Sequence, residues 1–204
     1  MSIELLNIDC MEYMATLPDK AFDLAIVDPP YGIDVTKMNM GGRKTVKKDL
    51  TKSWDSGVPD DAYFLELFRI SKAQVIWGGN YFALPCSRYF AIWDKGETMY
   101  GRDFAECEYA WVSCGGTRIF KLSPNQLERF HPTQKPVKLY EWLLTNYAKP
   151  EFKILDTHLG SGSSAIAAHY GGFDFVGCEL DTDYYNAAKK RFEQATAQLA
   201  MFGA

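Results

Sequence analysis

An aspartate follows a run of apolar residues and precedes two prolines, in the order Asp28-Pro29-Pro30-Tyr31. A residue before proline is restricted to extended conformations, so Asp28 and Pro29 are both held extended. Prolines have no N–H, and this turn therefore presents a carboxylate and carbonyl oxygens without competing donors. Such a surface can bind an amino group through its two hydrogens, and Tyr31 adds a ring that can stack on a planar base. The alternative interpretation is a strand-ending turn capped by an aspartate.

A second group of residues points to a nucleoside pocket. Gly160-Ser161-Gly162 follows an apolar run that ends at Asp156, and Glu179 comes 19 positions after Gly160. Glycines in such a turn allow a ligand to approach the backbone, and an acid about 20 residues further on accepts hydrogen bonds from ribose hydroxyls. The pattern also fits a dinucleotide site, but only 25 residues (180–204) follow Glu179, too few for a second mononucleotide half. Asp156 suits a cationic cofactor better than a pyrophosphate.

Short apolar runs alternate with amphipathic stretches, which is typical of an α/β fold built from βαβ units. The predicted strands are 4–8, 22–27, 74–77, 89–93, 108–112, 153–155 and 173–178. The predicted helices are 10–17, 62–71, 137–148, 163–170 and 184–202. Strand ends would then place Asp28, the glycine turn and Glu179 at loops.

Composition fits one globular domain spanning 1–204, with 47% hydrophobic and 24% charged residues. The net charge is −4, yet residues 37–52 hold six Lys/Arg and one acid. Residues 117–138 are also basic. Basic segments on an acidic body can form a footprint for a polyanion, although solvated surface is the alternative. The intervals 32–59 and 94–130 are therefore interpreted as loop insertions and as the candidate recognition region.

The chain has no apolar stretch of the roughly 20 residues that a membrane span needs. Its N-terminus lacks the pattern of a secretory signal. The five cysteines are scattered without CxxC pairs, which indicates reduced thiols rather than disulfides and argues against a structural metal site. We therefore expect a cytoplasmic protein without a metal or a membrane partner.

These motifs resemble those of the permuted amino-methyltransferases that act on adenine N6 or cytosine N4 of DNA, and phage and prophage members in particular. Asp-Pro-Pro-Tyr is the adenine-N6 form of the family's catalytic motif, whereas the cytosine-N4 form commonly begins with Ser. The resemblance covers nearly the whole chain, including 7–10, 77–82, 93–95, 131–136, 156–163 and 179–181. The chain departs from the commoner cofactor loop DPFxGSGT at Thr157, His158 and Ser163.

The resemblance implies a Rossmann-like fold with a mixed seven-stranded sheet, helices on both faces and a circularly permuted motif order. It implies S-adenosylmethionine as cofactor and a catalytic group of Asp28, Pro29, Pro30 and Tyr31. The cofactor-binding positions that it implies are Asp9, Cys10, Thr133, Lys135, Asp156, His158, Gly160, Ser161, Gly162, Ser163, Glu179 and Leu180. Lys135 would pair with the cofactor's carboxylate, although it is alternatively an ordinary exposed lysine. Asp9 is alternatively a helix cap, and His158 alternatively packs.

The reaction so implied is direct in-line methylation of adenine N6 on a base flipped out of double-stranded DNA. The predicted DNA contacts are Arg43, Lys44, Lys47, Lys48, Arg118 and Lys121. A homodimer is expected because many relatives dimerise. The alternatives that remain are cytosine-N4 methylation, methylation of an RNA base and a non-catalytic DNA-binding relic.

Overall fold

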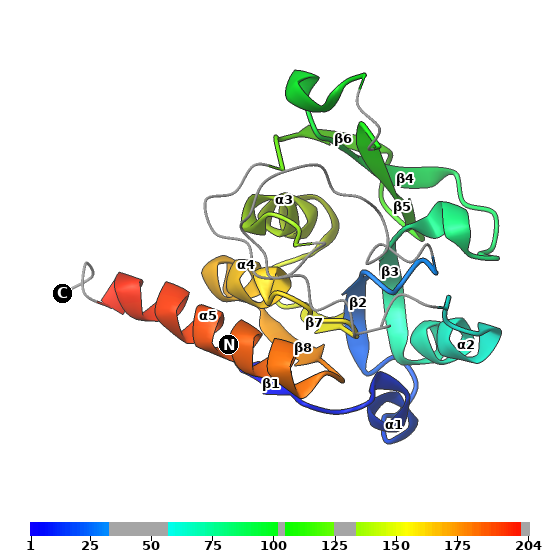
Figure 1. Cartoon of the computed structure of the whole chain (residues 1–204). Helices are drawn as coiled ribbons and strands as arrows, with labels where there is room; N and C mark the ends of the chain where they lie inside the picture. The colour runs from blue at the N-terminus through cyan, green and yellow to red at the C-terminus, as the bar shows by residue number, and fades with distance from the viewer. Residues whose placement is uncertain (33–56, 102–104, 125–133, 201–204) are drawn as a thin grey trace.

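The computed structural model describes residues 1–32, 57–101, 105–124 and 134–200, and the sheet at its centre is shown in Figure 1. The strands are β1 (Ile3–Leu6), β2 (Phe22–Val27), β3 (Ser71–Trp77), β4 (Tyr89–Asp94), β5 (Cys107–Val112), β6 (Arg118–Lys121), β7 (Lys153–Asp156) and β8 (Asp174–Cys178). They lie in the order β1-β8-β7-β2-β3-β5-β4-β6. All neighbouring pairs are parallel except the two that β5 makes, with β3 and with β4.

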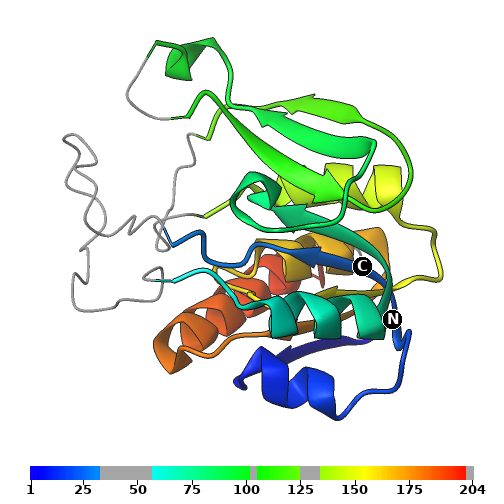
Figure 2. The same cartoon turned by 90° about the vertical axis from the view of Figure 1, so that its right-hand side faces the viewer.

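Helices cover both faces of this sheet, as Figures 1 and 2 show. On one face lie α1 (Cys10–Ala15) and α2 (Asp61–Ile70), and on the other lie α3 (Val137–Tyr147), α4 (Ser163–Gly171) and α5 (Thr182–Ala200). Alternate residues of a strand point to opposite faces, and the two cores follow this rule. Leu24 and Ile26 pack in the core beneath α3 and α4, whereas Ala25 and Val27 pack in the core beneath α1 and α2.

The register of the parallel strands brings the predicted motifs to one edge. Ala25 of β2 pairs with Leu155 of β7, which pairs with Val176 of β8. Asp28, His158 and Glu179 each lie three positions beyond these partners. The motifs therefore leave the sheet at the same level, on its carboxyl edge, where α/β proteins bind ligands. Strand β2, which leads to Asp28, precedes β7, which leads to the glycine turn, and this is the permuted order that the resemblance implies.

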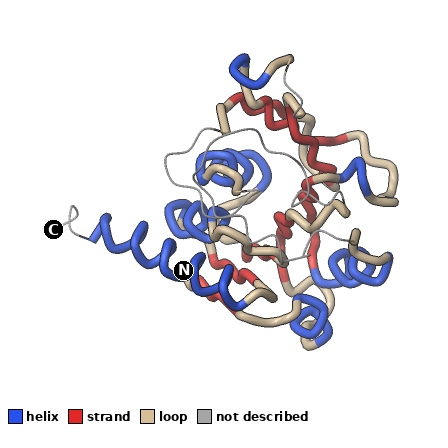
Figure 3. The backbone as a smooth tube through the Cα atoms, in the orientation of Figure 1, coloured by secondary structure: helices blue, strands red, loops and turns tan. Residues whose placement is uncertain are grey.

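The predicted fold class is confirmed: the sheet is mixed, helices lie on both faces and the element order agrees. The sheet has an eighth strand, β6, that the apolar pattern did not indicate. Three of its four residues are exposed, and β4 is its one neighbour among the described strands, so burial leaves little trace in its sequence. The tube in Figure 3 shows this strand at the outer end of the sheet.

The interval 94–130, interpreted above as a loop insertion that holds a predicted strand at 108–112, is not one continuous loop in its described part. It contributes a short 3-10 turn, η3 (Glu97–Met99), and then β5 and β6 to the sheet. Residues 33–56 of the other interval lie outside the described part of the chain. Within the described residues, no helix is both long enough and apolar enough to cross a membrane.

Candidate active site at the carboxyl edge of the sheet

A cavity of about 610 Å³ opens where β1, β2, β7 and β8 end. Most of the predicted site residues line it, from segments far apart in the sequence: Asp9, Cys10, Asp28, Pro30, Lys135, His158, Gly160, Ser161, Glu179 and Leu180. The turn after β2, residues 28–31, here called the acceptor turn, and the glycine turn after β7, residues 160–162, thus face one cavity. Its volume is in the range of sites for small molecules and cofactors.

The glycine turn is held to the end of β8 by Glu179. One carboxylate oxygen accepts a hydrogen bond from the Gly160 N–H at 2.9 Å, and the other accepts one from the Asp181 N–H at 3.0 Å. Gly160 has a positive φ of 51°, a conformation that suits glycine. Glu179 therefore both fixes the turn and lines the cavity beside it.

Asp156 lies beneath the glycine turn rather than at the cavity wall. Its side chain is 1% exposed and accepts hydrogen bonds from the Ser164 hydroxyl at 2.6 Å and from the His158 N–H at 3.0 Å. Burial raises the pKa of Asp156 to about 7, against the effect of these two donors. The structure gives Asp156 the position of an internal brace for the turn and does not place it facing a cationic ligand.

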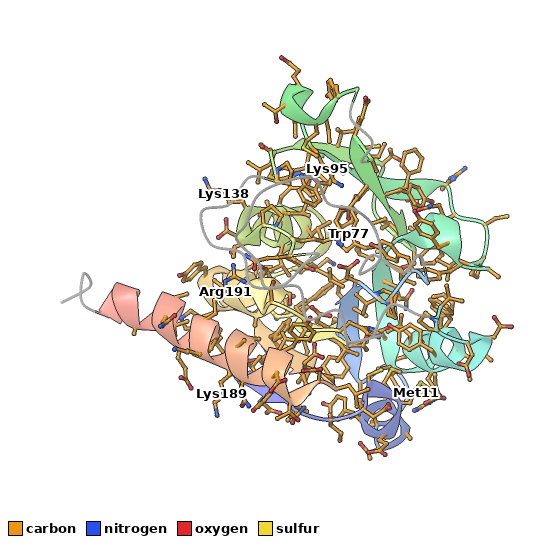
Figure 4. The ribbon with its side chains drawn as sticks, viewed as in Figure 1. Met11, Trp77, Lys95, Lys138, Lys189 and Arg191 are labelled. Carbon is orange, nitrogen blue, oxygen red and sulfur yellow. The ribbon has the colours of Figure 1, made fainter. Side chains whose placement is uncertain are left out.

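Gly162 and Ser163 likewise stand behind the cavity and join the turn to its neighbours. Gly162 lies against α5, since a Cβ there would come within 3.3 Å of Ala188. The Ser163 hydroxyl donates to the Lys135 carbonyl at 2.8 Å. Arg191 of α5, labelled in Figure 4, donates to the carbonyl of Ser161 at 2.7 Å and to the Ser163 hydroxyl at 2.9 Å.

At the acceptor turn, the Asp28 carboxylate is engaged by two donors. The Tyr31 hydroxyl donates to one oxygen at 2.6 Å, and the Lys135 ammonium bonds the other. Pro29 is buried, and the Tyr31 ring stacks on Tyr81 with 5.0 Å between centroids and 13° between planes. Burial, together with the neighbouring Asp28, raises the pKa of Tyr31 well above its usual value, so Tyr31 is a hydrogen-bond donor at neutral pH.

Lys135 does not have the position expected of a partner for the cofactor's carboxylate. It is 4% exposed, and its ammonium lies against Asp28 and 3.2 Å from a carboxylate oxygen of Glu108. The other oxygen of Glu108 lies 2.9 Å from the Lys95 ammonium. Lys135 also lies over the Trp77 ring, 5.3 Å from its centroid. Its surroundings are thus two internal carboxylates and an aromatic face.

The charges of Asp28, Lys135, Glu108 and Lys95 shift the pKa values of Lys135 and Glu108. Burial lowers the pKa of Lys135, but Asp28 and Glu108 outweigh it, and the pKa lies above the usual value for lysine. Burial raises the pKa of Glu108, but Lys135 and Lys95 outweigh it, and the pKa lies below the usual value for glutamate. Both side chains are therefore charged at neutral pH.

Several cavity residues had no signal in the sequence. Tyr63 of α2 reaches the cofactor loop and hydrogen-bonds the Thr157 hydroxyl at 2.6 Å, which in turn hydrogen-bonds His158 Nδ1 at 2.9 Å. Burial lowers the pKa of His158 to about 4, so the ring is neutral at physiological pH. Tyr140 of α3 also lines the cavity. A tyrosine on an amphipathic helix looks like an ordinary core residue, which is why neither Tyr63 nor Tyr140 was predicted.

Asp9 and Cys10 line the cavity at the start of α1. Asp9 accepts from the Met11 N–H at 2.7 Å, so it is the N-cap of this helix as well as a wall residue. Burial, with Asp9 as a second cause, raises the pKa of Cys10 to about 12, and its side chain is therefore a neutral thiol.

The predicted DNA contacts are only partly described. Arg118 and Lys121 are exposed on β6, and Lys121 pairs with Glu97 at 3.1 Å. Arg43, Lys44, Lys47 and Lys48, together with the predicted cofactor residue Thr133, lie outside the described residues.

Most of the chain matches a known protein family. Residues 37–190 match the profile of the N6/N4 DNA methylases, a family described as DNA methylase. The chain belongs to this DNA methylase family. The resemblance drawn from the motifs is therefore confirmed, whereas the choice between the two amino groups that the family name covers is left open.

Relatives with similar sequences carry methylase names. The chain is 28% identical to YubD of Escherichia coli (strain K12), a protein named as a methylase, over 95% of this chain and 90% of that protein. It is 30% identical to the type II methyltransferase M1.MboII of Moraxella bovis, over 40% of this chain and 32% of that enzyme.

Solved structures share the fold at low sequence identity. The complex of M1.HpyAVI with SAM (S-adenosylmethionine) superposes with a TM-score of 0.62 at 21% identity, over 93% of this chain and 99% of the other. The cytosine-N4-specific PvuII DNA methyltransferase gives 0.61 at 13% identity, over 97% and 91% of the two chains. The fold is thus that of known DNA methyltransferases, and structural neighbours include SAM complexes.

Gly78 permits the close approach of Tyr31, which can be tested. A Cβ on Gly78 would lie 2.2 Å from the Tyr31 ring, whereas one on Gly101 would meet nothing within 4 Å, and both residues have a positive φ, of 70° and 69°. We predict that Gly101→Ala costs about 1 kcal/mol of unfolding free energy and that Gly78→Ala costs about 1–3 kcal/mol more. Denaturant titration measures both, and equal losses would contradict the proposed packing.

The pKa of Asp156 predicts a pH dependence of stability. A carboxyl with a pKa of about 7 in the folded protein retains a proton that the unfolded chain releases near pH 4, so this group lowers stability as pH rises from about 4 to 7. Asp156→Asn lacks this group. The unfolding free energy of the variant minus that of the parent should therefore increase by up to about 1.4 kcal/mol for each unit that the pH rises in that window. His158, whose contribution has the opposite sign, is unchanged in the variant. Parallel plots of unfolding free energy against pH for parent and variant would refute this prediction. Asp19→Asn, a change at an exposed aspartate, is the control.

Proposed function

We propose that this protein transfers a methyl group from S-adenosylmethionine to N6 of adenine in DNA. The observation that carries the proposal is that the acceptor turn, with Asp28, and the glycine turn, with Gly160 and Glu179, line the same cavity. A single displacement requires the amino group and the methyl donor to meet in one such space. The family match supplies the reaction class, and the shared cavity supports the proposed roles of these residues.

The cavity suits S-adenosylmethionine by the chemistry of its walls. Glu179 presents a carboxylate beside the part of the glycine turn that lines the cavity, which is an arrangement for binding ribose hydroxyls. Asp9, Cys10, Leu180 and His158 complete the wall around this position. When bound, the cofactor supplies an electrophilic methyl group on a sulfonium, and the protein's residues orient the nucleophile toward it.

Asp28 has the task of orienting the amino group. A carboxylate offers about four lone-pair sites, so Asp28 can accept an N6 hydrogen while Tyr31 and Lys135 remain bonded to it. The Pro29 carbonyl is the proposed acceptor for the second hydrogen. With both hydrogens held, the nitrogen lone pair is directed out of the ring system toward the methyl group, and no covalent enzyme intermediate is needed.

The target base must leave the duplex to reach this cavity. The Tyr31 ring is already stacked on Tyr81, whose side chain is 46% exposed, so we propose that the flipped base packs beside this aromatic pair. Arg43, Lys44, Lys47, Lys48, Arg118 and Lys121 remain the proposed phosphate contacts.

Cytosine N4 is the second candidate target. A cytosine-N4-specific enzyme shares the fold, and cytosine N4 is an exocyclic amino group like adenine N6. The aspartate at the first position of the acceptor turn favours adenine, given the motif forms of the family described above.

The identity of the product tests the proposal. Incubation of unmethylated genomic DNA with the protein and S-adenosylmethionine, followed by nucleoside digestion and mass spectrometry, should yield N6-methyladenine. Asp28→Ala should lower this yield at least about 100-fold, because it removes the acceptor that orients the amino group, without weakening cofactor binding. Asp19→Ala, on the surface away from the cavity, is the control. N4-methylcytosine as the product would support the second candidate, and full activity of Asp28→Ala would refute the assigned role.

Glu179 is tested by cofactor binding alone. Glu179→Gln replaces an oxygen that accepts from Gly160 or Asp181 by a donor and removes the charge, so the dissociation constant of S-adenosylmethionine should rise at least about tenfold. Calorimetry measures it, with the exposed Glu4→Gln on β1 as the matched control. An unchanged constant would remove Glu179 from the proposed cofactor site.

A further inference from the structure

Four side chains of alternating charge form a row that leads from the cavity into the sheet: Asp28, Lys135, Glu108 and Lys95, here called the ion chain. Lys135 bonds Asp28 and lies 3.2 Å from Glu108, and Glu108 lies 2.9 Å from Lys95. The exposed fractions of these side chains are 17%, 4%, 25% and 13%. Figure 4 shows Lys95 and Trp77 on the side of the molecule formed by β3, β4 and β5.

Removing such charges from water is unfavourable unless each has a partner, so a row of four partly or fully buried charges needs a reason. Only Asp28 and Lys135 line the cavity, whereas Glu108 and Lys95 lie behind them on β5 and just after β4. The two outer members are therefore not among the residues that line the cavity. Their contribution has to pass through Lys135.

Lys135 is confined on several sides besides Asp28. Trp77 of β3 lies under its ammonium, the Tyr31 hydroxyl lies 3.4 Å away, and Glu108 holds it from β5. The other titratable groups near this cluster are Tyr140 of α3, which interacts with Asp28 and Glu108, and Asp156 of β7, which interacts with Asp28. Without Glu108, Asp28 would be the one carboxylate left beside the ammonium among the described residues, and the contact that holds the ammonium from β5 would be lost.

We propose that Glu108 is a positioning residue for methyl transfer: it holds the Lys135 ammonium against Asp28 and thereby fixes the carboxylate that orients the target amino group. Lys95 completes the arrangement by neutralising the second oxygen of Glu108. The inference rests on the proposed function, because it assigns Glu108 a part in the reaction at Asp28.

The proposal predicts a specific pH signature. Glu108 raises the pKa of Lys135, as Asp28 does, whereas burial lowers it. Removing the charge of Glu108 leaves burial opposed by Asp28 alone, so the pKa of Lys135 falls. Deprotonation of Lys135 would then release Asp28, and the rate would decline on the alkaline side at a lower pH than in the parent protein. If the role of Glu108 were merely structural, the pH of this alkaline decline would not change.

The test is single-turnover methylation of genomic DNA at saturating S-adenosylmethionine from pH 6.5 to about 10, close to the ordinary pKa of lysine. The parent should show no alkaline decline in this range. Glu108→Gln should lower the rate about 10- to 100-fold at pH 7.5, leave cofactor affinity unchanged and introduce an alkaline decline. Glu108→Asp, which keeps the charge, should remove that decline. Glu106→Gln, the same change at an exposed site just before β5, should behave as the parent.

The outcomes separate this inference from the proposed function. No methylated adenine from the parent protein would refute the proposed function, whereas an active parent whose Glu108→Gln variant keeps its rate and pH profile would overturn the inference alone. If Glu108→Gln does not fold, the parent still provides a test by NMR of side-chain-labelled lysine, with the Lys135 signal assigned by its loss in Lys135→Met. A Lys135 signal that titrates below about pH 10 would overturn the inference.

Discussion

The parallel pairing of β2 with β7 and of β7 with β8 is the constraint on which the site depends. Because Ala25, Leu155 and Val176 are in register, the chain leaves all three strands at one level. The acceptor turn then faces the same cavity as the cofactor loop and Glu179, although well over a hundred residues of sequence separate it from them. A shift of one strand by a single residue would move Asp28 to the other face of the sheet.

Charged side chains hold the loops on two sides of this cavity. Asp156 braces the glycine turn from below, and Glu179 ties it to β8 at the side. On the far side of the cavity, Lys135 joins Asp28 to Glu108. Asp156 and Glu179 thus fix the conformation of the cofactor loop. Lys135, with its partners Asp28 and Glu108, fixes the acceptor turn. The cavity between them is the space in which we propose that the methyl donor and the amino group meet.

The sequence predicted the parts that have a local signature. Buried strands such as Phe22–Val27 have continuous apolar runs, and the glycine turn and the double proline impose their own backbone geometry, so their places were predicted correctly. The edge strand β6 was missed because it is short and mostly exposed. The partners of Lys135 could not be predicted, because Asp28, Glu108 and Lys135 lie on separate segments, and only the folded sheet determines which carboxylates meet the ammonium. For the same reason, Asp156 was expected to face a ligand, whereas it bonds His158 and Ser164 on either side of the glycine turn.

A crystal structure of the protein with S-adenosylmethionine tests the central claim most directly. The account predicts electron density for the cofactor in the cavity, with the ribose hydroxyls on the Glu179 carboxylate and the sulfonium methyl group directed toward Asp28. Cofactor density that leaves Glu179 unbonded, or that places the methyl group on the side of the glycine turn remote from Asp28, would contradict it.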